Sequence, residues 1–363
     1  MNLNNYEPYF KYRSLFFNFY LILNLALSIV SCNAQAEKFT YKGTPKKYFV
    51  SSVHLGLYKK HVEKEKLKAY DLTRSLPKGY LKNGTKDYTK YLQDGMNNYR
   101  VVIFPNFPVL VNKEGLGIKS NSTVIFQKNS KLIMEPNAMD SYQVLRLFNI
   151  KNSVVYFPVI KGDRNYHLDT KGEWGMGISI MGSSNIKIIN PKISDCWGDG
   201  IYIGKSLNSS KNINIYYPEL DNNRRNGISI VSGDRIFVES PLVSNTHGTM
   251  PGCGIDIEPN NNNDEINNIF INNPITYNNE RYGISIYMKF LRGKLKKDVN
   301  ISINNHLDNG SISGFIIDEP SGSYKADRPL MGNVIITKPI WINNKKRIVF
   351  KNNEFSPKLV IKN

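Results

Sequence analysis

A short motif, Gly-Ile-x-Ile, recurs along the middle of the chain and constrains the fold more than any other feature. Successive copies begin 23, 27, 27 and 29 residues apart, and a weaker copy follows after 31. Units of this length cannot bury an apolar face alone, so they must stack to form one continuous core. The copies begin at Gly177, Gly200, Gly227, Gly254 and Gly283, and the weaker one at Gly314.

Two further apolar stretches lie between consecutive copies. The longer one ends at a proline, as in 185–191 and 212–218, and the shorter one follows the proline and ends in Asp or Asn. All three alternate apolar and polar residues, as β-strands with one buried face do. The period therefore predicts an all-β fold, a right-handed single-stranded parallel β-helix with three strands per coil. Leucine-rich repeats and propellers have other repeat units and do not fit.

The Asp and Asn residues that end the shorter stretch recur at one position of the coil. Parallel stacking places equivalent side chains above one another, where amides form hydrogen-bonded ladders. We interpret these residues as fold residues before site residues. They are Asp195, Asn222, Asn245, Asn278 and Asn309.

The N-terminal residues have the features of an export signal. Basic residues precede an apolar run at 15–30, which is too short for a stable membrane span. Cys32 stands where a bacterial lipobox requires it, whereas Ala34-Gln35-Ala36 fits ordinary cleavage after Ala36. We therefore exclude residues 1–36 from the fold and expect an exported protein, either an outer-membrane lipoprotein or a periplasmic or secreted one.

The remaining chain divides into two parts. Residues 37–85 are Lys-rich and weakly patterned, and we expect a linker or small packing segment. The β-helix domain is predicted over 86–363 and opens with a helix at 87–96, whose apolar residues recur at helical spacing. Because the end of a stacked core must be covered, this helix is expected to cap it.

The chain is strongly basic, with 48 Lys and Arg against 30 Asp and Glu, a net charge of +18. Such an excess is typical of proteins that bind nucleic acid, anionic membranes or acidic substrates, but a Lys- and Asn-rich background composition produces it as well. No nucleic-acid-binding module is recognised, so no nucleic acid is expected as a partner. Membrane attachment is expected only through lipid on Cys32.

The chain has only three cysteines, too few for a disulfide-stapled fold. Cys196 and Cys253 fall two coils apart, a separation of about 9.6 Å if strands stack at about 4.8 Å. A disulfide tolerates roughly 7 Å between its Cα atoms. We therefore predict that both are reduced and buried.

The order of these pieces resembles the pectate-lyase-like superfamily over about residues 70 to 340. The resemblance begins with an Asp-x-Thr…Gln helix at 87–93 and a Val-x-Phe-Pro strand at 102–105. It implies a parallel β-helix acting on a carbohydrate polymer, often an acidic one, and the superfamily includes lyases, hydrolases, epimerases and phage tailspikes. Further matching stretches are Gly162-Asp-Arg164 with His167, 172–177, 197–200 and 254–259.

The motifs of two characterised activities in this superfamily are mostly missing. Of the acidic and basic motifs that polygalacturonase-type hydrolases carry on successive coils, only Asp199 has a counterpart here, so polygalacturonase chemistry is not expected. The calcium and arginine pattern of pectate lyases is not clearly present either.

The longest turns precede the Gly-Ile-x-Ile strands, so we expect a binding groove along that sheet. Alternation points Tyr202 and Asp256 outward, and Glu258, two residues further, shares their face. Asp199 ends a turn between two glycines, which permit unusual backbone angles. The catalytic candidates are Asp199, Arg225, Asp256, Glu258 and His247.

Two reaction types remain open. In β-elimination, an arginine of the 224–225 pair would neutralise a uronate carboxylate, and His247 or Tyr202 would act as the base. Asp256 with Glu258 would then hold a cation. In hydrolysis, two of the three candidate carboxylates would serve as acid and base.

Candidates for substrate binding come mainly from the polar turn at 162–174, since turns on a rigid scaffold commonly carry function. Trp174 and Trp197 occupy equivalent positions one coil apart. Exposed rings would stack on sugars, and buried rings would pack in the core. The candidates are Asp163, Arg164, His167, Glu173, Trp174, Trp197, Tyr202 and Arg224.

Two functions are therefore considered. The first is an exported enzyme that degrades a polysaccharide by β-elimination or hydrolysis, and the alternative is a non-catalytic glycan-binding or surface-structural β-helix. No cofactor is required by the sequence. The polar run at 260–264 suggests Ca²⁺, but a polar turn explains that run equally well. Phosphate-binding loops, dinucleotide fingerprints, zinc spacings and nucleophile elbows are absent.

Overall fold

The computed structural model describes residues 39–318, 330–350 and 357–363, so the expected export signal at 1–36, with Cys32, lies outside the described residues. The chain divides into two units after Thr40, and the fold described below is that of the second, Tyr41–Asn363. Among the residues the structure describes, no helix is long and apolar enough to cross a membrane.

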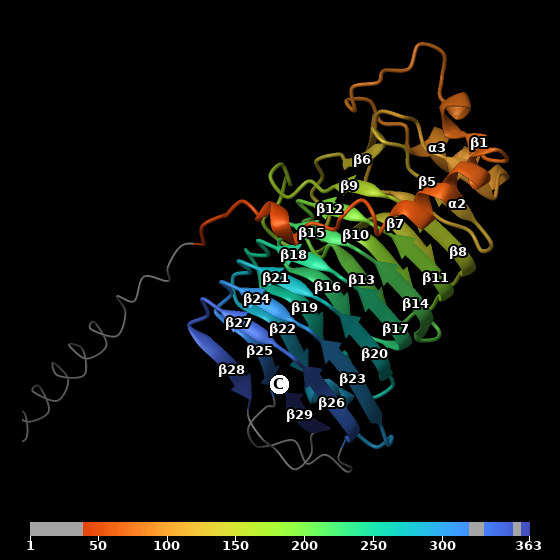
Figure 1. The fold of residues 1–363 in the computed structure, drawn as a ribbon. Helices are drawn as coiled ribbons and strands as arrows, with labels where there is room; N and C mark the ends of the chain where they lie inside the picture. Colours follow the sequence, from red (N-terminus) through yellow and green to blue (C-terminus); the bar gives the residue numbers. More distant parts are fainter. Residues whose placement is uncertain (1–38, 319–329, 351–356) are drawn as a thin grey trace, which may run out of the picture. The chain divides into compact units, whose positions relative to one another are not determined.

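Three long parallel sheets make up this unit, and each coil contributes one strand to each sheet (Figure 1). Sheet A contains β1 (Tyr70–Asp71), β2 (Val101–Ile103), β5 (Thr123–Ile125), β8 (Lys151–Tyr156), β11 (Ser184–Ile189), β14 (Ser210–Tyr216), β17 (Gly233–Glu239), β20 (Ile266–Asn272), β23 (Asp298–Asn304), β26 (Met331–Thr337) and β29 (Lys358–Lys362). The predicted stretches that end at a proline are β11, β14, β17, β20 and β26 of this sheet.

The other two sheets hold the predicted short strands and the Gly-Ile-x-Ile strands. Sheet B contains β3 (Pro108–Val111), β6 (Lys131–Met134), β9 (Val159–Lys161), β12 (Lys192–Ser194), β15 (Glu219–Asp221), β18 (Leu242–Ser244), β21 (Ile275–Tyr277), β24 (Leu307–Asn309) and β27 (Ile340–Ile342). Sheet C contains β4 (Leu116–Gly117), β7 (Ser141–Phe148), β10 (Trp174–Met181), β13 (Ile201–Gly204), β16 (Asn226–Ile230), β19 (Cys253–Ile257), β22 (Tyr282–Tyr287), β25 (Ser313–Asp318) and β28 (Lys346–Phe350). The prediction of a three-strand coil is confirmed.

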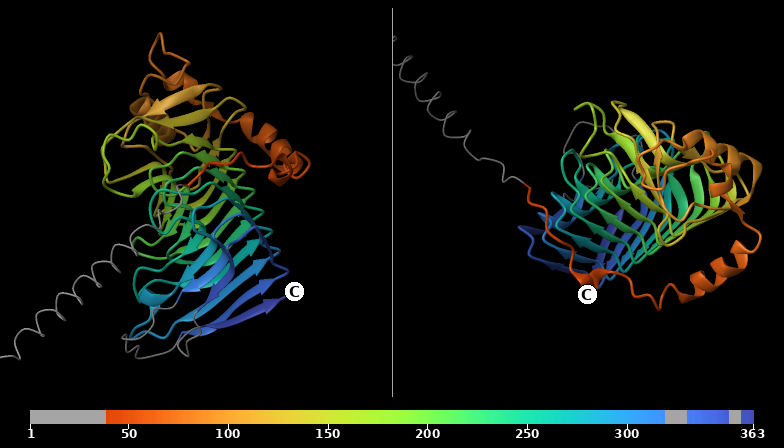
Figure 2. Two further views of the ribbon diagram at one scale, coloured as in Figure 1. Left: turned by 90° about the vertical axis from the view of Figure 1, so that its left-hand side faces the viewer. Right: turned by 90° about the horizontal axis from the view of Figure 1, so that it is seen from above.

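The core is built by isoleucines that stack in register from coil to coil. Ile201 pairs with Ile228, which pairs with Ile255, and all three are fully buried. Burying one such side chain contributes about 1.5–3 kcal/mol. The repeat therefore becomes a continuous apolar column, along which the strands of successive coils lie side by side (Figure 2).

The residues between these isoleucines form an outward row on sheet C, as the alternation predicted. The row runs in register through Ser179, Tyr202, Ser229, Asp256 and Ser285. It is not the open surface that a groove implies, because Ser229 is fully buried and Asp256 is only 2% exposed.

The predicted side-chain ladder is present at the corner between sheets B and C. Asn222 donates to Asp195 at 2.6 Å, and Asn278 donates to Asn245 at 2.7 Å. A second ladder, which was not predicted from the sequence, joins Asn212 to Asn185 at 2.7 Å near the starts of β14 and β11 in sheet A. Asp195, Asn222, Asn245 and Asn278 adopt positive φ, a conformation that Asn and Asp tolerate better than other side-chain-bearing residues. The prediction was wrong by one position at Asn309, which lies within β24 and pairs with Tyr277, so that Gly310 takes the positive-φ place in that coil.

The predicted N-terminal helix is α3 (Thr89–Asn98). Its Leu92 and Met96 are buried in the main core cluster, and Gln93 bonds both the N–H and the carbonyl of Gly117 in β4. The helix therefore packs against the first coil of sheet C. The remaining helices are α2 (Gly56–Lys66) and the short η1 (Lys46–Tyr48), η2 (Leu72–Ser75) and η3 (Lys289–Leu291).

Parts of the segment at 37–85, expected as a linker or packing segment, lie against the outside of the coils. Val62 of α2 packs in a cluster with Ile125 and Ile189 of sheet A. Residues 41–49, which we call the strap, lie on sheet B, where the Thr44 hydroxyl bonds Ser244 at 2.9 Å.

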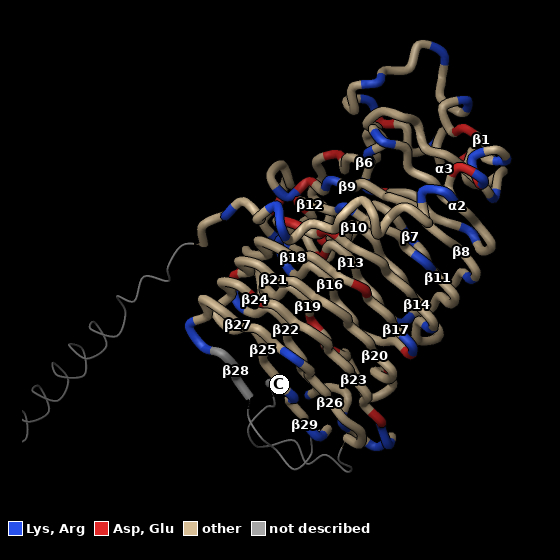
Figure 3. Tube along the Cα trace, in the orientation of Figure 1, with Lys and Arg blue, Asp and Glu red and all other residues tan. Residues whose placement is uncertain are grey.

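Cys196 and Cys253 are both free and buried, as predicted. The basic residues are scattered over turns along the coils and over the N-terminal part (Figure 3).

Candidate functional site

Five charged residues gather on the outer side of sheet C, and we call them the sheet C cluster. Glu173, Asp199 and Arg225 stand immediately before or near the starts of β10, β13 and β16, whereas Asp256 and Glu258 lie in and just after β19. Because equivalent points of parallel coils stack, side chains separated by a whole coil in sequence come together here.

Asp199 is the most enclosed member of the sheet C cluster. Its side chain is fully buried, lies 3.1 Å from the Arg225 guanidinium and accepts a 3.0 Å bond from the Asn226 N–H. Burial raises the pKa of Asp199, while Arg225 opposes that shift. This carboxyl is thus held by the coil that follows it.

Asp256 lies beside Glu258 and is nearly as buried. Its Oδ2 accepts a 3.3 Å bond from the Asn226 amide, but its Oδ1 is buried without a hydrogen-bond partner. Burial first, and then the neighbouring Glu258 carboxylate, raise the pKa of Asp256 well above its usual value, against the effect of Arg225. The Glu258 side chain is 28% exposed, so it faces solvent at the edge of the sheet C cluster.

Arg225 links the carboxylates of the sheet C cluster. Besides Asp199, its nitrogens lie 3.9 Å from Glu173 and 3.9 Å from Glu258. Burial lowers the pKa of Arg225, but Asp199 and Asp256 raise it more, so its pKa is above the ordinary value. The Arg225 charge is therefore already balanced by the protein.

Tyr202 stands in the outward row next to the sheet C cluster. Burial, followed by the charge of Asp199, raises its pKa to about 12. A tyrosine with this pKa is a poor base near neutral pH, because its phenolate form is scarce.

The structure places four predicted binding residues in a different assembly, which we call the turn cluster. Asp163 is buried and accepts hydrogen bonds from Tyr142 and from His167, the latter at 2.8 Å. The His167 and Trp197 rings stack with their centres 4.0 Å apart. The Arg224 guanidinium carbon lies 3.7 Å from the centre of the Trp197 ring. His167 Nε2 is buried without a hydrogen-bond partner.

The two tryptophans have separate environments. Trp197 is 8% exposed and packs in the turn cluster, whereas Trp174 is 47% exposed at the start of β10. Of the two alternatives, packing applies to Trp197, and only Trp174 presents a ring to solvent. A shared stacking platform is therefore not formed.

Arg164 and His247 also lie apart from the sheet C cluster. Arg164 donates to the Asn222 carbonyl at 2.8 Å, and burial lowers its pKa to about 10. His247 Nδ1 lies 2.8 Å from the Asn245 carbonyl, and burial lowers its pKa. The charged groups with the largest effects on the pKa of His247 are Arg164, Glu280 and Asp221, none of which belongs to the sheet C cluster.

The run considered for Ca²⁺ forms a turn closed by its own backbone. Asp264 is 2% exposed, and its Oδ2 accepts hydrogen bonds from the N–H groups of Asn260 and Asn261, each at 2.9 Å. Over the described parts of the chain, no group of three or more His, Cys, Asp or Glu is placed to hold a metal ion.

Cavities are found on another face of the coils. One of about 280 Å³ lies between the strap and sheet B, and a second of about 420 Å³ lies near the corner of sheets A and B. Neither is lined by the sheet C cluster. The first cavity could not be predicted from the sequence, because the strap that forms one of its walls has no periodic pattern.

Three parallel sheets, a stacked isoleucine core and side-chain ladders define a parallel β-helix. Residues 111–291 match the family model described as a right-handed β-helix region. This agrees with the resemblance to the pectate-lyase-like superfamily.

The curated relative YclG, an uncharacterized protein of Bacillus subtilis, is 29% identical in an alignment of 213 residues that covers 50% of this chain and 36% of YclG. The chain thus spans about a third of that relative. Among solved structures, the fold is similar to an iota-carrageenase complexed to iota-carrageenan fragments, with a TM-score of 0.55 and 12% identity over 81% of this chain and 90% of that one. It is also similar to a polygalacturonase from Erwinia carotovora, with a TM-score of 0.51 and 13% identity over 77% of this chain and 95% of that one.

Proposed function

We propose that this protein is an exported carbohydrate-active enzyme that hydrolyses glycosidic bonds of a polysaccharide. The observation that carries the proposal is the pairing of Asp256 with Glu258, two neighbouring carboxyl groups in unlike environments. Glycosidases use such a pair, in which the buried group keeps its proton and acts as the acid. In this proposal Asp256 is the acid and Glu258 the base.

The surroundings of the pair support these roles. Burial and the neighbouring Glu258 carboxylate raise the pKa of Asp256, which favours the protonated form that a general acid needs. Glu258 is exposed enough to meet a water molecule. Arg225 and Asp199 would act as positioning residues, because the Asp199–Arg225 ion pair fixes the guanidinium near Glu258.

Hydrolysis fits the sheet C cluster better than β-elimination does. A lyase needs a cation that is free to neutralise a uronate carboxylate. Arg225 already lies between Asp199, Glu173 and Glu258, and Arg224 is stacked on Trp197. The elevated pKa of Tyr202 also weighs against this residue as the base.

The choice of a polysaccharide as substrate rests on fold-level similarity. The two solved structures named above are a carrageenase and a polygalacturonase, and the β-helix presents long sheets along which an extended chain could lie. Export through residues 1–36 would bring the protein to such polymers.

A non-catalytic glycan-binding protein remains the second candidate, and a specific observation favours it. Asp256 is 2% exposed, and the cavities described above open on sheet B instead of over the sheet C cluster. A protein that only binds a sugar polymer would need no accessible acid and base.

The discriminating experiment is product analysis. The purified full chain is incubated with acidic and neutral polysaccharides, and reducing ends and ultraviolet absorbance are followed together. Hydrolysis predicts new reducing ends without the absorbance of unsaturated sugars. Reducing ends with that absorbance would indicate a lyase, and glycan binding without either signal would support the non-catalytic alternative.

A further inference from the structure

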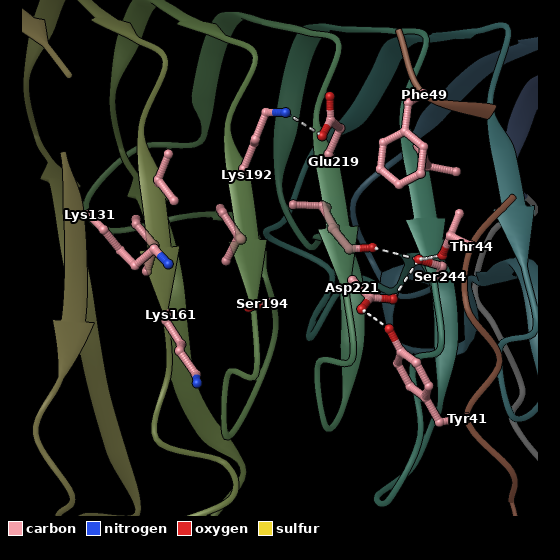
Figure 4. A pocket seen from close by; sticks show the side chains of 15 residues that line it. Tyr41, Thr44, Phe49, Lys131, Lys161, Lys192, Ser194, Glu219, Asp221 and Ser244 are labelled. Carbon is pink, nitrogen blue, oxygen red and sulfur yellow. Dashed lines mark hydrogen bonds and ion pairs between the residues drawn. The ribbon is translucent and has the colours of Figure 1, made fainter. Parts of the chain in front are cut away.

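The strap and sheet B enclose a pocket, which we call the strap pocket. It has a volume of about 280 Å³, close to the lower end of the roughly 300–1,000 Å³ of ligand sites. Figure 4 shows its walls, with lysines on one side and strap aromatic residues on the other. Its polar and aromatic lining residues include Lys131, Lys161, Lys192, Glu219, Asp221, Tyr41 and Phe49.

Some of the charged side chains that line the strap pocket have a charged or hydrogen-bonding partner, and others do not. Lys192 pairs with Glu219 at 2.8 Å, and Asp221 accepts bonds from the Tyr41 hydroxyl at 2.9 Å and the Ser244 hydroxyl at 2.7 Å. Within the described residues, neither Lys131 nor Lys161 forms an ion pair. One end of the strap pocket therefore carries two uncompensated ammonium groups.

The strap holds two aromatic rings on the side of the strap pocket away from Lys131 and Lys161 (Figure 4). Tyr41 is 53% exposed and Phe49 is 44% exposed, although both line the strap pocket. Lys42 and Asn245 exchange two hydrogen bonds, of 3.1 and 3.0 Å, and so fix the strap to the corner of the coil. Rings held in advance lose little freedom when a ligand binds.

We propose that the strap pocket binds a short oligosaccharide with an anionic group on one of its sugar units, at a site separate from the sheet C cluster. Lys131 and Lys161 bind the carboxylate or sulfate of the ligand. The rings of Tyr41 and Phe49 contact a sugar ring, and the carboxylates of Glu219 and Asp221 accept hydrogen bonds from sugar hydroxyls. A more highly charged phosphate ligand is disfavoured, because Glu219 and Asp221 line the same pocket. Only the choice of a sugar rests on the proposed function.

The test is calorimetric titration of the full chain with digalacturonate, a sulfated disaccharide and neutral cellobiose. We expect an anionic sugar to bind. Its affinity should fall about tenfold or more in each single variant, Lys131→Gln or Lys161→Gln, and further in the double lysine variant that carries both changes. Digalacturonate and the sulfated sugar separate the carboxylate from the sulfate as the preferred group. The matched control replaces two exposed sheet A lysines, Lys151→Gln and Lys187→Gln, and should bind as the wild type does.

Three results would overturn the strap pocket proposal: no binding, equal affinity for cellobiose, or unchanged affinity in the double lysine variant. The Glu258→Gln variant separates this proposal from the proposed function. It should lose hydrolysis and keep disaccharide binding, whereas the double lysine variant should lose binding even if no hydrolysis is ever detected.

Discussion

The Arg225 guanidinium lies 3.1 Å from Asp199 Oδ2, and the two residues belong to successive coils. The side chain of Asp199 is fully buried and that of Arg225 is 14% exposed. This ion pair ties the start of β13 to the start of β16 and sets the position of the guanidinium beside Glu258. It is therefore the link between the stacking of the coils and the chemistry proposed for the sheet C cluster.

Arg225→Met should destabilise the fold strongly. The substitution leaves the buried Asp199 carboxylate without its partner, a loss of about 3–5 kcal/mol in comparable buried pairs. Chemical denaturation measures the free energy of unfolding. The matched control is Arg235→Met, because Arg235 is 59% exposed and pairs with Asp234; about 1 kcal/mol or less is expected there. Equal losses in the two variants would show that the Asp199 pair is not specially stabilising.

The isoleucine column predicts a sharp contrast between inner and outer positions. Ile228→Ala should cost about 2–5 kcal/mol, because it opens a cavity in a fully buried stack. Ile340 is 58% exposed on β27, and Ile340→Ala should cost about 0.5 kcal/mol or less. A small loss at Ile228, measured by the same denaturation, would contradict the continuous core.

His306 should make the fold sensitive to acid. It is fully buried between Trp341, which donates to Nδ1 at 3.0 Å, and Thr276, whose hydroxyl lies 2.8 Å from Nε2 and donates to Asp308. Burial lowers the pKa of His306 to about 3. In the unfolded chain, His306 binds a proton below about pH 6.5. The stability that comes from burying neutral His306 is therefore fully present above pH 6.5 and is lost as the pH falls toward 3.

The test for His306 compares stability against pH in the wild type and in His306→Gln. The difference between them should shrink as pH falls from 7 to 4, since only the wild type has the histidine to protonate on unfolding. Comparing the two proteins cancels the opposite contribution of Asp308, whose pKa burial raises. Parallel curves would contradict a buried neutral His306.

Asp256 should respond to the charge of Glu258. Because Glu258 is the second cause of the raised pKa, Glu258→Gln should lower the pKa of Asp256, as followed by carboxyl carbon chemical shifts in NMR. A raised carboxyl pKa lowers stability as pH rises above about 3.9. Asp256→Asn should therefore gain stability relative to the wild type with rising pH. An unchanged Asp256 titration in Glu258→Gln would remove the basis for the unequal pair.

The sequence predicted the coils well because one periodicity encodes both the strands and their stacking. Ile201 and Ile228 are placed by a repeat that needs no knowledge of the turns. The accessibility of Asp256 could not be predicted in the same way. It depends on polar turns such as 258–265, which are tied by contacts like Lys297 Nζ to the Asp264 carbonyl at 2.7 Å, and the spacing of the motif does not encode these contacts.

The candidate site was predicted in part for the same reason. Outward alternation and the turn positions brought Asp199, Arg225 and Asp256 to one face. The pairing of His167 with Asp163 depends on how a single irregular turn folds back, and no pattern in the sequence reports it.

The central claim is that Asp256 and Glu258 are the acid and base of glycoside hydrolysis. The most direct measurement is the rate of reducing-end release from the best polysaccharide substrate by the wild type, Asp256→Asn and Glu258→Gln. Matched controls are Asp298→Asn and Glu114→Gln, two exposed carboxylates away from the sheet C cluster. We predict a loss of about 100-fold or more in each site variant and wild-type rates in the controls. Wild-type rates in Asp256→Asn and Glu258→Gln would contradict the account.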